Sequence, residues 1–179
     1  MSWLQLINAR LFAVVAGLAF IAFAAGARAE DAPGCKALAW PLDAERTAFA
    51  NEKLDSFGSG AARGPWKEQA FALKLTPQES VVFEVPPGSE RRPEGQAFGA
   101  TVSFDAPAQA GLYYVALSFE GWIDVVQNGA SVRSDAHTGA KDCAGLRKSV
   151  RFPIGSFPIM LQLSGVSTDT IKIGIRPAR

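Results

Sequence analysis

The clearest strand signal of the chain lies in residues 111–134, GLYYVALSFEGWIDVVQNGASVRS. Residues 111–119 are apolar on both faces, which is typical of a strand in the middle of a sheet. The next two segments, 122–126 and 131–134, also have strand-type composition, and Gln127-Asn128-Gly129 lies between them. Asn-Gly between two such segments predicts a hairpin turn. The stretch therefore predicts three consecutive short strands.

The same strand signal recurs on both sides of this stretch. Six more short segments predict strands, most of them by alternation of apolar with polar residues: 71–75, 81–85, 98–104, 149–154, 158–163 and 170–175. Pro153 and Pro158 place two of these strands toward a sheet edge or a strand end. About nine short strands with frequent turn residues predict an all-β fold, an antiparallel β-sandwich or jelly roll. A closed barrel is the alternative.

The segment over residues 30–64 lacks this alternation. Pro41 suits the first position of a helix, and apolar residues at rough helical spacing predict one short helix over residues 41–57. Residues 56–64, SFGSGAARG, predict a glycine-rich linker. We therefore expect an N-terminal segment with a helix and a linker over residues 30–64, followed by a β-sandwich domain over residues 65–179.

Residues 1–29 have the three parts of a secretory signal peptide. Arg10 precedes an uncharged apolar run at residues 11–25, and Ala27-Arg28-Ala29 forms an A-x-A cleavage site. The alternative is a membrane anchor, but the apolar run is shorter than the roughly 20 residues that a spanning helix needs. We predict cleavage after Ala29, a periplasmic or secreted protein, and no stable membrane insertion after cleavage.

The charge balance argues against a nucleic-acid partner. The full chain has a formal net charge of +1, and residues 1–29 hold two arginines and no acidic residue, so cleavage would leave −1. A nearly neutral chain exerts no long-range attraction on nucleic acid.

Cys35 and Cys143 are the two cysteines of the chain. An exported protein can form a disulfide between them, which would tie the start of the mature chain to its late part. Two free buried thiols or a metal pair are the alternatives, although the wide spacing does not match a zinc site. We expect the disulfide.

The densest group of chemically interesting side chains lies in residues 121–152. If Ile123 and Val125 point inward, Asp124 points outward with Trp122, and the pair could stack on a sugar ring and accept its hydrogen bonds. The alternative places Trp122 in the core and pairs Asp124 with a nearby cation, Arg147, Lys148 or Arg151. Residues 134–145 predict a loop, a common place for binding residues. The candidate binding residues are Trp122, Asp124, His137, Arg147 and Lys148.

The sequence contains no complete catalytic or metal-binding set. His137 is the single histidine, so the sites that need two histidines for iron or copper cannot form within one chain. There is no D-x-D-x-D-G calcium motif and no G-x-S-x-G nucleophile motif. We therefore predict no metal, no cofactor and no catalytic residue. The alternative is a hydrolase in which His137 is the general base, oriented by Asp124 or Asp135.

The chain resembles a group of small exported proteobacterial proteins that have no established activity. The resemblance lies in Cys35, Cys143 and five segments: GLYYV at 111–115, GWIDVV at 121–126, DAHTG at 135–139, GLRKSVRF at 145–152 and LQLSG at 161–165. Residues 111–126 are also similar in strand pattern to the bacterial pre-peptidase C-terminal domain, a jelly-roll accessory module.

Taken with the residues, these resemblances favour an exported, non-catalytic β-sandwich that binds an envelope glycan or an envelope protein. A periplasmic hydrolase that uses His137 and a structural envelope protein without a ligand are the alternatives.

Overall fold

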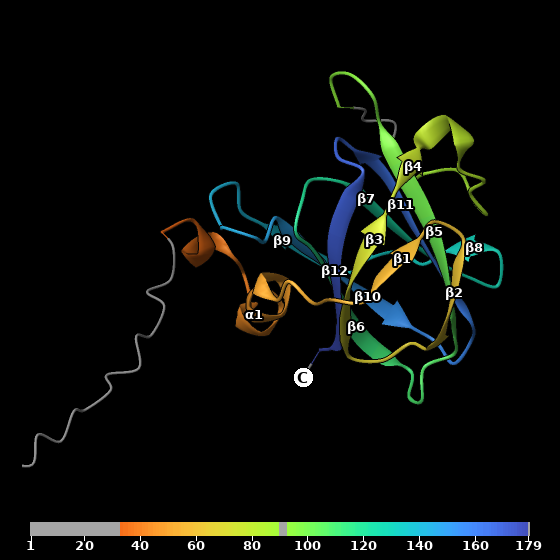
Figure 1. Cartoon of the computed structure of the whole chain (residues 1–179). Helices are drawn as coiled ribbons and strands as arrows, with labels where there is room; N and C mark the ends of the chain where they lie inside the picture. The colour runs from red at the N-terminus through yellow and green to blue at the C-terminus, as the bar shows by residue number, and fades with distance from the viewer. Residues whose placement is uncertain (1–32, 90–92, 179) are drawn as a thin grey trace, which may run out of the picture. The chain divides into compact units, whose positions relative to one another are not determined.

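The computed structural model describes residues 33–89 and 93–178, and the described chain forms twelve β-strands, one α-helix and two short 3-10 helices (Figure 1). The predicted signal peptide, residues 1–29, lies outside the described residues. Within the described ranges, no helix is long and apolar enough to cross a membrane.

The strands form two six-stranded sheets. Sheet A has the order β1 (Ser56–Gly58), β3 (Gln69–Lys74), β12 (Thr170–Pro177), β6 (Gly111–Leu117), β10 (Lys148–Ile154) and β9 (Ala136–Gly139). Sheet B has the order β2 (Ala61–Pro65), β5 (Phe98–Asp105), β11 (Ile159–Val166), β7 (Trp122–Gln127) and β8 (Ala130–Ser131), and β4 (Thr76–Pro77) also pairs with β5. The mostly β fold predicted from the alternation is therefore confirmed.

The two sheets pack on one shared hydrophobic core. Val115 and Leu117 of β6 and Leu161 and Leu163 of β11 belong to it, and each is at most 1% exposed. Their neighbours in sequence point to the outer faces, as the pleat of a strand requires. As predicted for residues 111–119, β6 is an interior strand, paired with β12 on one side and β10 on the other.

The strand count and the strand directions differ from the prediction. The described residues contain twelve strands rather than about nine, and both sheets are mixed, because β1 runs parallel to β3 and β2 runs parallel to β5. The two parallel strands, β1 and β2, lie in residues 56–65, whereas we predicted residues 56–64 to be a linker. Their glycines and small residues give no alternation, so only the pairing with β3 and β5 makes them strands.

Two further predictions for local structure were wrong. Residues 134–145 are not all loop, because Ala136–Gly139 form β9 at the edge of sheet A. Residues 81–85 are not a strand, although their burial alternates along the segment. They lie over the outer face of sheet B, where the Gln162 side chain rather than a neighbouring strand bonds to the backbone of Glu84 and Val85.

The N-terminal segment covers the outer face of sheet A. It contains the 3-10 helix η1 (Pro33–Ala37) and the helix α1 (Asp43–Ala50), which is shorter than the predicted 41–57 because Asn51 already has an extended conformation, with φ −72° and ψ 122°. Leu42 and Phe49 form a second hydrophobic cluster with Ala116 of β6. Gly174 of β12 permits this contact, since a Cβ there would lie 3.0 Å from Glu45 Cγ.

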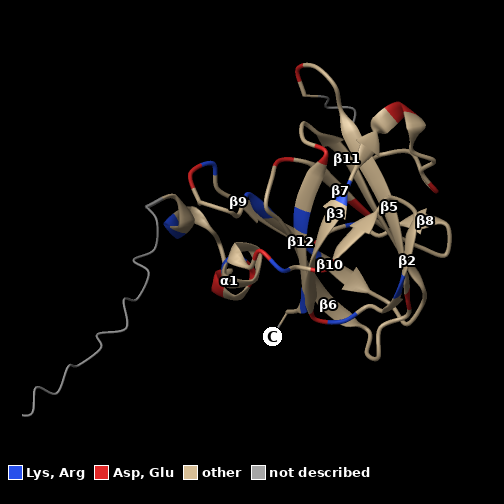
Figure 2. Ribbon diagram, viewed as in Figure 1, with Lys and Arg blue, Asp and Glu red and all other residues tan. Residues whose placement is uncertain are grey.

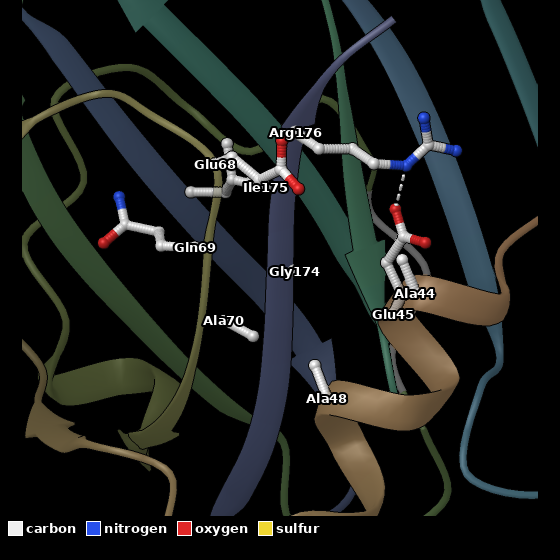
Figure 3. A pocket seen from close by; sticks show the side chains of 9 residues that line it. All are labelled: Ala44, Glu45, Ala48, Glu68, Gln69, Ala70, Gly174, Ile175 and Arg176. Carbon is white, nitrogen blue, oxygen red and sulfur yellow. Dashed lines mark hydrogen bonds and ion pairs between the residues drawn. The ribbon is translucent and has the colours of Figure 1, made fainter.

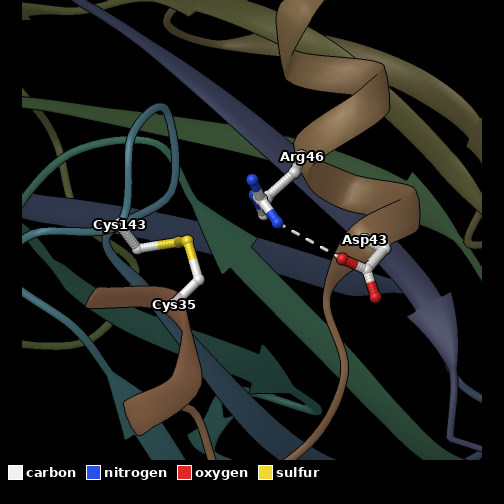
Figure 4. Close-up of a disulfide and its surroundings, with 4 residues drawn as sticks. All are labelled: Cys35, Asp43, Arg46 and Cys143. Carbon is white, nitrogen blue, oxygen red and sulfur yellow. Dashed lines mark hydrogen bonds and ion pairs between the residues drawn. A yellow bond between two sulfur atoms is a disulfide. The ribbon is translucent and has the colours of Figure 1, made fainter. Parts of the chain in front are cut away.

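The predicted disulfide between Cys35 and Cys143 is confirmed (Figure 4). It joins η1 to the segment that follows β9, and both cysteines are part of the second cluster. The bridge therefore fastens the N-terminal segment to the edge of sheet A.

Candidate binding pocket beside Trp122

Strand β7 places Trp122 and Asp124 on the outer face of sheet B. Ile123 and Val125 point into the shared core, at 5% and 0% exposure, as the alternation predicts. Trp122 remains 40% exposed, so it is not a core residue. Asp124 faces the same side, yet it is only 8% exposed. Something on the outer face must therefore cover Asp124.

The cover is residues 81–89, which we call the strap. Its odd-numbered residues are half-buried and its even-numbered residues are exposed. Phe83 and Val81 pack on Gly99 of β5, where an added Cβ would lie 3.2 Å from the Phe83 ring and 3.5 Å from Val81. The strap thus buries one side on sheet B without pairing with any of its strands.

Side chains of sheet B hold the strap by its backbone. The amide of Gln162, a residue of β11 that is 1% exposed, accepts hydrogen bonds from the N–H groups of Glu84 (2.6 Å) and Val85 (3.2 Å) and donates to Val85 O (3.0 Å). On the neighbouring strand β7, Asp124 Oδ2 accepts the Gly88 N–H at 3.0 Å. Gln162 and Asp124 are directly opposite each other in the register of β11 and β7.

The other oxygen of Asp124 holds Trp122. Its Oδ1 accepts the indole N–H at 3.0 Å, so one buried carboxylate joins the Trp122 ring to the strap. Its hydrogen-bond partners are thus Trp122 and Gly88, in place of the nearby cations Arg147, Lys148 and Arg151 that we considered. A carboxylate buried to this extent needs such donors, because it has lost most of its hydration.

A pocket of about 290 Å³ lies beside the Trp122 ring, and its lining consists of Ser89, Glu120, Gly121, Trp122, Lys148 and Gly165. The Lys148 ammonium is 5.5 Å from the centre of the Trp122 ring and donates a 2.8 Å hydrogen bond to Gly121 O. Gly121 lies too close to β11 for a side chain, since a Cβ would be 2.8 Å from Val166 Cγ2. The pocket therefore combines an aromatic ring, an ammonium, a carboxylate and a hydroxyl.

Gly165 has its left-handed conformation, with φ 65°, where the pairing of β11 with β5 shifts register. Such bulges bend a strand and often lie next to binding sites. The Gly165 N–H donates to Gln78 Oε1 at 2.7 Å, so the bulge is held from outside the sheet.

Arg147 is not a lining residue of the pocket, but it forms an ion pair with Glu120, which is one. Both side chains stay partly exposed, at 28% and 48%. Figure 2 shows that basic and acidic residues are interspersed along the rest of the described chain as well, so this ion pair is not part of a patch of one charge. The Arg147 guanidinium therefore positions the Glu120 carboxylate and is not an open anion-binding fork.

His137 is not part of this lining. It is an exposed residue of β9, opposite Val150 of β10. Asp135, close to it in sequence, accepts hydrogen bonds from Arg151 Nε (2.9 Å) and Nη2 (3.0 Å). These hydrogen bonds, together with the positive charge of Arg151, hold the pKa of the Asp135 carboxyl below its usual value of 3.8.

Of the five candidate residues, Trp122 and Lys148 line one pocket, and His137 is outside its lining. Asp124 and Arg147 are each bonded to a lining residue, Asp124 to Trp122 and Arg147 to Glu120. Sequence reasoning missed Glu120, Ser89 and Gln162. Glu120 stands in a turn between two predicted strands, and Gln162, like Ser164, is a buried polar residue of a mostly apolar strand. A charged residue in a turn and a polar residue within an apolar strand were the sequence signals that could have identified Glu120 and Gln162.

Another pocket lies between α1, β3 and β12, with a volume of about 220 Å³ (Figure 3). Much of its lining consists of small residues: Ala44, Ala48, Ala70 and Gly174. Glu45 of α1 and Arg176 of β12 point toward each other at its rim, and Arg176 Nε donates to Glu45 Oε1. This ion pair fastens α1 to sheet A through Oε1 of Glu45, while Oε2 of the same buried carboxylate has no hydrogen-bond partner among the described residues.

The described residues contain no cluster of three or more histidine, cysteine or acidic side chains that could hold a metal ion.

Comparison of the chain with protein-family models, with curated proteins and with solved structures finds no match. The resemblance to exported proteobacterial proteins and the similarity to the pre-peptidase C-terminal domain therefore stay predictions.

Proposed function

We propose that this protein is a non-catalytic, exported β-sandwich protein that binds an envelope glycan, with one sugar ring seated in the pocket beside Trp122. One observation carries the proposal: the Trp122 ring is 40% exposed in a pocket while its edge is fixed by a hydrogen bond to a buried carboxylate. An aromatic ring fixed in this way loses little conformational freedom when a ligand stacks on it.

The polar groups around the ring suit a sugar. Sugar hydroxyls both donate and accept hydrogen bonds. The lining contains the Glu120 carboxylate, an acceptor that also pairs with Arg147, and the Lys148 ammonium, a donor that also bonds to Gly121 O. A volume of about 290 Å³ lies just below the roughly 300–1,000 Å³ typical of pockets for drug-sized ligands, which suits a single ring.

The hydrolase alternative receives less support from the same contacts. A histidine base needs a carboxylate that orients its ring. Asp124 is bonded to Trp122 and Gly88, and Asp135 is bonded to Arg151. Both carboxylates that could serve His137 thus have other partners, and we favour binding without catalysis.

The test uses residues 30–179 and a panel of defined saccharides: methyl glucoside, methyl galactoside, N-acetylglucosamine and glucuronic acid. The indole N–H signal of Trp122 in an NMR titration reports on the pocket, and the signals of Trp40 and Trp66 serve as internal references. We expect at least one sugar to shift the Trp122 signal alone. Trp122→Ala should weaken its binding at least tenfold, which corresponds to about 1.4 kcal/mol.

Phe157→Ala is the matched control, because Phe157 is another exposed aromatic residue, at 49% exposure. It should leave sugar affinity unchanged. If no sugar on the panel shifts the Trp122 signal, or if Trp122→Ala binds as well as the wild type, the glycan proposal is wrong. In the first case a protein partner or a structural role without a ligand takes its place.

A further inference from the structure

The strap and the pocket share one chain of contacts. Asp124 Oδ2 accepts the Gly88 N–H and Asp124 Oδ1 accepts the Trp122 indole N–H, each at 3.0 Å. The next residue along the strap, Ser89, belongs to the pocket lining. The position of the strap is therefore linked to that of the ring on which the proposed ligand stacks.

Gly88 is in direct contact with both groups that it positions. A Cβ at this residue would lie 2.8 Å from Asp124 Oδ1 and 3.0 Å from Trp122 Nε1. Only a residue without a side chain lets the strap backbone come this close. If the strap moves away, the buried Asp124 loses one of its two donors and the indole edge loses its packing.

Gln162 holds the middle of the strap by its backbone. It is 1% exposed, and its amide provides both the acceptor for Glu84 N and Val85 N and the donor for Val85 O. A single side chain thus does for the strap what a neighbouring strand does inside a sheet. Gln162 is not among the residues that line the pocket.

We propose that the strap is a lid coupled to the pocket, and that Gln162 is a positioning residue that sets the orientation of Trp122 through the strap. This inference rests on the proposed function for its ligand, but the coupling itself is a property of the free protein. Because such coupling is reciprocal, a ligand that requires the fixed Trp122 ring must also hold the strap closed.

The first test needs no ligand and measures hydrogen exchange of residues 30–179 by NMR. Gln162→Met keeps the volume of the side chain and removes its hydrogen bonds. We expect exchange at the amides of Glu84 and Val85 to become at least tenfold faster, and exchange at the Gly88 amide and the Trp122 indole N–H to accelerate with it. Faster exchange at Glu84 and Val85 with no change at Gly88 and Trp122 would overturn the coupling.

Gln127→Met is a matched control. Gln127 also lies in sheet B and also holds backbone, with hydrogen bonds to Gly155 and Phe157. Its substitution should accelerate exchange at Gly155 and leave Trp122 unchanged. If Gln162→Met does not fold, Gly88→Ala is used instead, because its Cβ would push the strap away from Asp124 and Trp122. Gly64→Ala is the control for this variant, because a Cβ at Gly64 meets nothing within 4 Å. An unchanged Trp122 indole signal in Gly88→Ala would likewise refute the coupling.

The second test adds a sugar that shifts the Trp122 signal. It should slow exchange at Glu84 and Val85, and Gln162→Met should bind it about tenfold more weakly. Binding with an unchanged strap would overturn the lid. If no sugar binds at all, the proposed function fails, and the measurements without ligand still decide whether Gln162 and Trp122 are coupled.

Discussion

Removing the disulfide between Cys35 and Cys143 should destabilise the whole domain. We choose the double variant Cys35→Ala/Cys143→Ala, because both cysteines are buried and a hydroxyl in their place would lack a partner. The bridge spans a sequence separation of 108 residues. In the chain-entropy model, a closed loop of this length lowers the free energy of folding by about 4.8 kcal/mol at 25 °C.

The folded state should survive the substitution. The N-terminal segment keeps its other attachments, which are the Arg176–Glu45 ion pair, the hydrogen bond from Lys172 to Phe49 O and the hydrogen bond from Ala39 N to Thr138 Oγ1. We therefore expect a loss of between about 3 and 5 kcal/mol, most of it from the freed unfolded chain. At about 2–4 °C per kcal/mol for a domain of this size, Tm should fall by about 6–20 °C.

Urea unfolding followed by circular dichroism measures this change directly. Wild-type protein in reductant is the second arm, and its stability should match that of the double variant. A thiol assay confirms that the unreduced wild type has no free cysteine. A double variant within about 1 kcal/mol of the oxidised wild type would refute the reasoning, since constraint of the unfolded chain would then contribute little.

The remaining predictions concern packing and charge. Leu161→Ala should cost about 2–5 kcal/mol in the same unfolding assay, because Leu161 is fully buried between the sheets. Glu45→Gln should cost about 1–3 kcal/mol, less than the roughly 3–5 of a fully buried pair, because Arg176 is 20% exposed. Since Arg151 lowers the pKa of Asp135, this pair stabilises the fold above the unfolded pKa, and the stability gap between wild type and Asp135→Asn should close as the pH falls from about 5 toward 2.

Each of these predictions has an internal control. Leu112→Ala, at a 38% exposed leucine, should cost less than about 1 kcal/mol, and an equal effect at both leucines would contradict the burial argument. Asp43→Asn, two residues before Glu45 in α1 and 71% exposed, should change the stability little. A stability gap for Asp135→Asn that persists at pH 2 would mean that the carboxylate charge is not its source.

Much of the fold could be predicted from the sequence because period-two alternation is a local signal. It located β3, β5, β7, β11 and β12 through the residues that face the core. It failed where strands have little pattern, as in Ser56–Gly58 and Ala61–Pro65, whose pairing depends on partners distant in sequence.

Residues 81–85 show the opposite error. Val81, Phe83 and Val85 do alternate in burial with their neighbours, so the pattern was right about which side faces the protein. Alternation cannot distinguish an extended segment bound by side chains from one bound by a neighbouring strand, because both have the same side-chain period. The partner here is the amide of Gln162, which lies 77 residues from Val85.

The candidate site likewise has features that the sequence predicts and features that it does not. The outward position of Trp122 and Asp124 follows from the spacing of Ile123 and Val125, which the sequence contains. The pairing of Asp124 with Gly88, and of Arg147 with Glu120, depends on how loops pack in three dimensions. Proximity of cationic residues in the sequence was therefore a poor guide to the partner of Asp124.

The place of β12 in sheet A governs the order in which this protein can fold. Residues 170–177 pair with β3 on one side and β6 on the other, so they occupy the middle of the sheet. During synthesis, β3 and β6 emerge long before the strand that joins them, and each presents an open edge until it arrives. Pairings over such distances in sequence are slow to form, and open edges attract other chains. Sheet A therefore cannot be complete before β12 has been synthesised. A chain that stops before residue 170 would have two separate parts of this sheet, β1–β3 and β6–β10–β9, each with one more open edge than in the folded protein.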